Sequence, residues 1–319
     1  MSKILQYELW QECNNRCTYC TLGRENFYTP ERLKIAAINK AIQDIKKLNK
    51  GEVSTLGFIG GEFFQGQLFH PEVKQAFVEL IDTSNELLNK GIINELWINA
   101  TLTIGDQADF FETLNKIDKK DCLWVLTSWD NLGRFHTPKM FEAWQNNLYR
   151  IHREYPEVRI NITTIITKVF IDDYLSGDFN IADFEQQYHA KLFLKTPVKP
   201  DDLSHRTKYE INDHLRYWFF PREKDFMMFL VTFLEREGES AYDNLFSNDL
   251  KAEELHKNFN IDELRDVVFI RNSDFEEKLY CDKSLKNIEQ SPCGHSNIYK
   301  CFADTDSCAV CLKQFVKNF

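Results

Sequence analysis

The sequence lacks the features that would place the protein in a membrane, outside the cell or on a nucleic acid. The first ten residues, MSKILQYELW, have no apolar signal-peptide core, and no apolar run approaches the length of a membrane span. No Lys/Arg-rich run stands out, and 49 acidic residues outnumber 39 basic ones for a net charge of −10. A broad nucleic-acid-binding face would need many positive charges against phosphates, although a small basic groove fits this composition. We therefore expect a cytoplasmic protein without a membrane partner.

A disulfide framework is also missing. The nine cysteines are odd in number and the chain has no secretory signal, so they are better explained as reduced thiols and metal ligands. Three lie in the first twenty residues, five lie after position 280, and Cys122 stands alone between them. Cys122 begins an apolar, strand-like run, and we expect it to be a buried structural thiol.

The chain does contain a regular alternation of strands and helices. Its 319 residues, 43% hydrophobic and 28% charged, suffice for one large α/β domain and an appendage. Side-chain periodicity predicts strands at 4–10, 54–59, 95–102, 123–129, 158–166 and 191–196, with helices at 31–48, 71–88, 110–117, 137–151 and 181–188. Such alternation predicts a parallel sheet, and six units are too few for a closed eight-stranded barrel.

The alternation stops near residue 198. We expect three segments: an α/β domain over 1–198, a helical extension over 199–279 with helices at 221–238, 249–259 and 261–267, and a cysteine-rich tail over 280–319. Met227, Met228, Phe229 and Phe233 are better explained as groups that pack across the open side of the α/β domain than as a cofactor pocket.

The first cysteines are spaced Cys-x3-Cys-x2-Cys, at Cys13, Cys17 and Cys20. A cubane iron–sulfur cluster takes one thiolate per iron, so three thiolates leave one iron open to a ligand that is not protein. An incomplete zinc site and unrelated core cysteines are the alternatives.

This spacing resembles the cluster loop of the radical S-adenosylmethionine (SAM) superfamily, in which the open iron chelates the amino and carboxylate groups of SAM. Tyr19 stands where that family often has an aromatic residue near the adenine. The resemblance implies a partial (βα)6 parallel barrel over 1–198, with the working groups at the carboxyl ends of the strands.

Two further segments carry the resemblance. Gly60-Gly61-Glu62 follows the second predicted strand and is similar to the family's Gly-Gly-Glu motif, which binds the SAM amino group; the family often has proline next, where this chain has Phe63. Glycines there would let the backbone approach the ligand closely. Thr127-Ser128-Trp129-Asp130 resembles the Ser-x-Asp-Gly segment of peptide-modifying members, which implies that Ser128 contacts SAM. Asn131 replaces the usual glycine.

Alternation on the other strands selects a set of polar side chains opposite the helix-packing face: Asn99, Thr101, Asn161, Thr163 and Lys195. They would point into the barrel, where they either face SAM or substrate or only hydrogen-bond to one another. We take Asn161 as a candidate SAM ligand.

The tail carries a second ligand set: Cys293, Cys301, Cys308 and Cys311, with Cys281 upstream and His295 inside it. Four thiolates can hold a tetrahedral zinc or fill a [4Fe-4S] cube. The segment resembles a truncated auxiliary-cluster domain of the SPASM or twitch type, which favours an auxiliary iron–sulfur cluster over zinc.

The resemblance implies an enzyme that reductively cleaves SAM at a [4Fe-4S] cluster to a 5′-deoxyadenosyl radical, which abstracts hydrogen from substrate. The strand-four segment and the tail favour a peptide or protein side chain as substrate, and an electron donor such as flavodoxin or ferredoxin would be needed. One alternative is a radical SAM enzyme for a nucleotide or RNA, with zinc in the tail. Another is a non-catalytic zinc-binding interaction protein.

Overall fold

The computed structural model describes residues 3–15, 17, 28–66, 68, 70–130, 134–195, 225, 229, 232–233 and 235–238, together with the backbone of 267–271 and 276–279. Within these residues, no helix is both long enough and apolar enough to cross a membrane.

One curved sheet organises the fold. Its six predicted strands are all present and pair in parallel, neighbour to neighbour in chain order. They are β1 (Ile4–Glu8), β2 (Thr55–Ile59), β3 (Glu95–Asn99), β4 (Leu123–Trp129), β5 (Arg159–Ile165) and β6 (Lys191–Lys195). This arrangement is an open α/β sheet with the strand order of a partial parallel barrel, and it confirms the predicted fold class.

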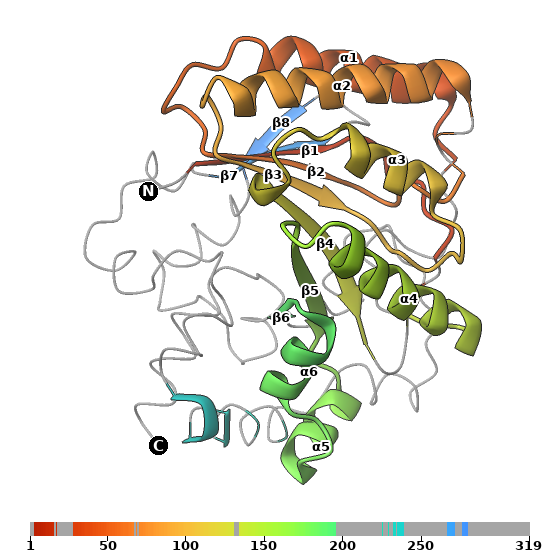
Figure 1. Ribbon diagram of the computed structural model, residues 1–319, viewed down its shortest axis with the longest axis vertical. Coiled ribbons are helices and arrows are strands. Elements are labelled where there is room, and N and C mark those ends of the chain that lie inside the picture. The colour runs from red at the N-terminus through yellow and green to blue at the C-terminus, as the bar shows by residue number, and fades with distance from the viewer. Residues whose placement is uncertain are drawn as a thin grey trace.

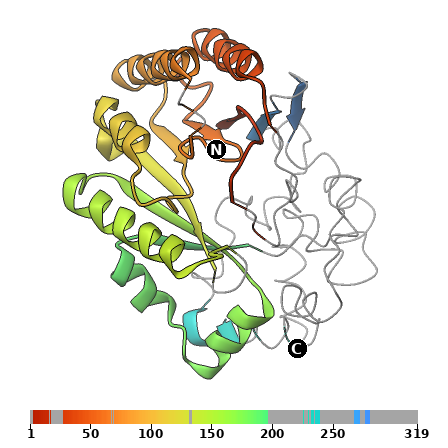
Figure 2. The ribbon, with the colours of Figure 1, turned by 90° about the vertical axis from the view of Figure 1, so that its right-hand side faces the viewer.

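Helices cover the outer face of the curve (Figures 1 and 2). They are α1 (Glu31–Ile45), α2 (Pro71–Asn89), α3 (Ala108–Lys116), α4 (Pro138–Glu154), α5 (Lys168–Ser176) and α6 (Ile181–Tyr188), with a 3-10 turn, η1 (Lys120–Cys122), before β4. Each presents apolar residues at helical spacing to the sheet; on α1 these include Ile38, Ala41, Ile42 and Ile45, all buried.

Sequence reasoning missed helix α5. Its signals are local: the Thr167 side chain caps the helix by accepting from Phe170 N at 3.1 Å, and Gly177 ends it in the left-handed conformation (φ 88°). Phe229 and Phe233, which lie in the predicted helix at 221–238, are buried against Tyr174 of α5. The prediction that Phe229 and Phe233 serve packing is confirmed. Tyr174 of α5 is one of the residues that they contact.

The extension over 199–279 is not wholly helical, and this prediction is wrong in two places. β7 (Val267–Arg271) pairs in parallel with β1, and β8 (Glu276–Leu279) pairs antiparallel with β7. Val267 had been assigned to a helix, but Val-Val-Phe-Ile is a β-branched and aromatic run that suits a strand beside β1. The helix at 249–259 and the tail over 280–319 lie outside the described residues, and the segment boundaries at 198 and 279 stay predictions.

Candidate functional site

The chain that leaves β1 runs directly against the loop that leaves β2. Gly61 N donates to Trp10 O and Glu62 N donates to Glu12 O, both at 2.9 Å. A Cβ on Gly60 would lie 2.3 Å from Trp10 O, and a Cβ on Gly61 would lie 2.2 Å from Glu12 O. The two glycines are therefore required by the chain's own backbone, whereas we expected them to make room for a ligand. Their effect is to hold the segment that precedes Cys13.

Glu62 is a buried carboxylate that ties two loops together. Its side chain accepts from the backbone N–H of Phe63 at 2.9 Å, of Phe64 at 2.8 Å and of Thr101. Burial raises the pKa of Glu62, and the hydrogen bonds from Thr101 and Phe64 oppose that shift. Phe63 thus supplies a donor that proline, frequent at this position in the resembling family, would lack. The loop after β2 is fixed to the start of the loop after β3.

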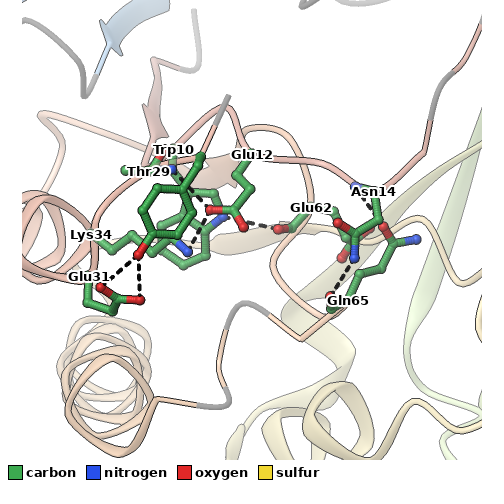
Figure 3. Close-up of polar contacts among 9 residues, drawn as sticks. Trp10, Glu12, Asn14, Thr29, Glu31, Lys34, Glu62 and Gln65 are labelled. Carbon is green, nitrogen blue, oxygen red and sulfur yellow. Dashed lines mark hydrogen bonds and ion pairs between the residues drawn. The ribbon is translucent and has the colours of Figure 1, made fainter. Parts of the chain in front are cut away.

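A second set of contacts fixes the approach to Cys13 (Figure 3). The fully buried Trp10 donates from Nε1 to Glu62 O at 3.0 Å. On the other side, Glu12 pairs with the buried Lys34 of α1 at 2.7 Å and accepts from Thr29 N at 3.1 Å. Because a buried ion pair strongly resists the loss of either partner, Glu12 anchors the loop to α1.

Gln65 connects the cysteine loop to β3. Its Oε1 accepts from Asn14 N at 3.2 Å, and its backbone O accepts from Asn14 Nδ2 at 2.7 Å. Its Nε2 lies 3.0 Å from Asn15 Oδ1 and 2.8 Å from the hydroxyl oxygens of both Thr101 and Thr103. Residues after β2 and β3 thus hold the short loop that follows β1. Neither Gln65 nor Thr103 is predicted from the sequence. The available signal is a polar residue, Gln65, three residues after Glu62.

Cys13 is half-buried and Cys17 is buried. Beside Cys17 lies Arg134, which is 8% exposed and whose Nη1 is 3.9 Å from Cys17 Sγ. Arg134 N donates to Asp130 Oδ1 at 3.1 Å, so the guanidinium comes from the part of the chain that follows β4. Arg134 had not been identified from the sequence, because its contact spans 117 positions.

The third predicted ligand cannot be placed. Cys20 and Tyr19 lie outside the described residues, as do Cys293, Cys301, Cys308 and Cys311, together with Cys281 and His295. Within the described part, no three His, Cys, Asp or Glu side chains converge as a metal site. Cys13 and Cys17 on one braced loop nevertheless fit the thiolate donor set of an iron–sulfur cluster.

Buried polar atoms near the sheet's inner face also suit a ligand. Asn15 Nδ2 and Asn161 Oδ1 have no hydrogen-bond partner among the described residues. Buried polar atoms are normally paired, so a donor beside the cysteines and an acceptor on β5 indicate a missing partner. This is the observation by which a bound cluster and SAM fit the site.

Ser128, which was predicted from the resemblance alone, lies on the inner side of β4. Its neighbour Thr127 is buried on the helix side, where its Oγ1 accepts from Trp144 Nε1 at 3.2 Å, so Ser128 faces the opposite, inner side. Ser128 pairs in register with Thr163 on β5, and Lys195 is exposed at the end of β6. Thr101 belongs to the Gln65 network.

Cys122 is half-buried on η1, and burial raises the pKa of its thiol.

Fold and site together define an open α/β sheet with a braced cysteine loop at the carboxyl ends of its first strands. No family model matches the chain, and no curated protein matches it. Among solved structures it resembles SuiB of Streptococcus suis. The structure of SuiB bound to its precursor peptide SuiA aligns over 97% of this chain and 71% of SuiB, with a TM-score of 0.50 at 11% identity. SuiB bound to S-adenosylmethionine aligns over 97% and 72%, with a TM-score of 0.48 at 12% identity. The likeness establishes the fold.

Proposed function

We propose that the protein is a radical SAM enzyme acting on a peptide or protein side chain. The observation that carries the proposal is the bracing of the cysteine loop: the backbone of residues 10–12 lies against Gly60-Gly61-Glu62 so closely that neither glycine can bear a side chain. The segment that leads into Cys13 and the Gly-Gly-Glu segment, which are far apart in sequence, would thereby become parts of one site.

In this proposal Cys13, Cys17 and Cys20 would hold a [4Fe-4S] cluster, and the iron without a cysteine would be available to SAM. The bound cluster and SAM supply the one-electron chemistry that breaks a carbon–hydrogen bond of the substrate. The protein's part is to fix and enclose them. Glu62 has its oxygens committed to three backbone N–H groups, so it positions the loop against which the SAM amino group would lie.

The inner face would hold the rest of SAM. We assign Ser128 and the buried acceptor Asn161 Oδ1 to its polar groups, and Tyr19 to its adenine. Asn161→Ala and Ser128→Ala are expected to weaken SAM binding. In contrast, Asn146→Ala, on the exposed side of α4, should leave it unchanged.

A peptide substrate is supported by two facts. The strand-four segment resembles that of peptide-modifying members of the superfamily, and the fold is shared with SuiB, which was crystallised with a precursor peptide. We further propose that Cys293, Cys301, Cys308 and Cys311 bind an auxiliary iron–sulfur cluster, and that flavodoxin or ferredoxin supplies the electron.

The test is anaerobic purification and reconstitution, followed by SAM and dithionite. The proposal expects absorbance near 400 nm, about four irons per chain for one cluster or eight for two, and release of 5′-deoxyadenosine. Absence of 5′-deoxyadenosine from iron-loaded protein would refute the enzymatic proposal. About four irons with one zinc would refute only the auxiliary cluster.

A further inference from the structure

We infer that Arg134 is a charge partner of the cluster, placed against Cys17 to favour the reduced state. The inference rests on the proposed function, because it requires a cluster at Cys17. It adds a residue from outside the cysteine loop to the redox apparatus.

The position of Arg134 is fixed by the fold. It follows β4, and its backbone N–H is held by the carboxylate of Asp130, which is 1% exposed. From there its Nη1 reaches to 3.9 Å from Cys17 Sγ, and the residue is itself only 8% exposed. The positive charge of Arg134 also acts on the buried carboxylate of Glu62, where it opposes the rise in the pKa of that group. A long cationic side chain normally extends into water, so a buried one lies among negative groups.

A cluster on three thiolates would add negative charge directly beside this guanidinium. Three thiolates outweigh the charge of the oxidised core, and one-electron reduction adds another negative charge without making or breaking a bond. A guanidinium against one ligand sulfur stabilises the reduced form more than the oxidised form. Since both groups are buried, solvent screens this interaction weakly. Net charge and hydrogen bonds to sulfur are established determinants of cluster potential.

Lys34, another buried cation of the site, does not present its charge to a cysteine sulfur. Lys34 pairs with Glu12 at 2.7 Å on the α1 side of the loop. Arg134 is thus the buried cation that the described residues place directly at a cysteine sulfur.

The experiment compares the reconstituted full-length wild type with Arg134→Gln, Arg134→Lys and Arg153→Gln in a dithionite redox titration followed by electron paramagnetic resonance. Arg153 lies exposed on α4 and is paired with Glu154, so Arg153→Gln removes the same formal charge at a distance. Circular dichroism establishes that each variant is folded. Equilibrium binding of SAM is measured in parallel.

Arg134→Gln should lower the equilibrium constant for reduction of the cluster at least tenfold. For one electron, this corresponds to a midpoint potential that is lower by about 59 mV. Arg134→Lys should restore most of the shift, and Arg153→Gln should show none. Cluster loss in Arg134→Gln that Arg134→Lys repairs also supports a requirement for charge.

An unchanged potential in folded, iron-loaded Arg134→Gln would overturn the inference, even if SAM affinity fell, since Arg134 would then serve SAM instead of the cluster. Cluster loss in both Arg134 variants would overturn it as well, because charge would not be the determining property. If the wild type itself takes up no iron, it is the proposed function that fails.

Discussion

Gly61→Ala tests whether the cysteine loop depends on the close approach of two backbones. The added methyl group would lie 2.2 Å from Glu12 O and 2.5 Å from Gln11 O, where ordinary contact begins at 3.4 Å. The two strands of chain would have to separate by about 1 Å, which is overpacking against backbone that cannot rotate away.

The cost follows from what resists that separation. Gly61 N–Trp10 O, Glu62 N–Glu12 O and Trp10 Nε1–Glu62 O, at 2.9, 2.9 and 3.0 Å, all join the two segments. Overpacking costs about 1–3 kcal/mol and each buried hydrogen bond that breaks costs about 1–3 more, so we expect a loss of about 3 kcal/mol in the free energy of unfolding.

Urea unfolding followed by circular dichroism measures this loss, and iron per chain after anaerobic reconstitution measures the effect on the cysteine loop. Gly105→Ala is the matched control, because a Cβ there meets nothing within 4 Å. It should lie within about 0.5 kcal/mol of the wild type and load iron normally. If Gly61→Ala behaved like Gly105→Ala in both measurements, the bracing of the loop by Gly60-Gly61-Glu62 would be refuted.

Three other predictions follow from the same structure. Burial raises the pKa of Glu62 above its usual 4.5, so its contribution to stability is fully present below pH 4.5 and is lost as pH rises through the folded-state pKa; Glu62→Gln should remove that part of the pH dependence in urea titrations, and an identical profile would contradict the assignment. Cys17→Ala should lose cluster iron and SAM cleavage, whereas Cys122→Ser should keep both, and 5′-deoxyadenosine formation by Cys17→Ala would exclude Cys17 as a ligand. Asn147 donates to two backbone carbonyls of the loop after β3, at 3.0 and 2.8 Å, so Asn147→Ala should cost about 2 kcal/mol or more in urea unfolding. The exposed Asn146→Ala is its control, and equal stability of the two variants would refute this role.

Local sequence patterns were sufficient to predict the parallel sheet. Side-chain periodicity located all six parallel strands, β1 to β6. The same method missed α5, whose cap signals at Thr167 and Gly177 flank only nine residues. It also placed Val267 in a helix, because a short apolar run outside the regular alternation carries little information on whether it pairs.

The sequence by itself determined the six-stranded order, the cysteine triplet and the position of Gly60-Gly61-Glu62 at a strand end, since all of these depend on spacing along the chain. Only the tertiary structure decided how those parts are joined. The glycines serve the backbone of residues 10–12, Gln65 ties Asn14 and Asn15 to β3, and Arg134 lies against Cys17. Each is a contact between residues 36 or more positions apart. Such contacts arise because the strands pair in parallel, which brings their carboxyl ends to one edge of the sheet.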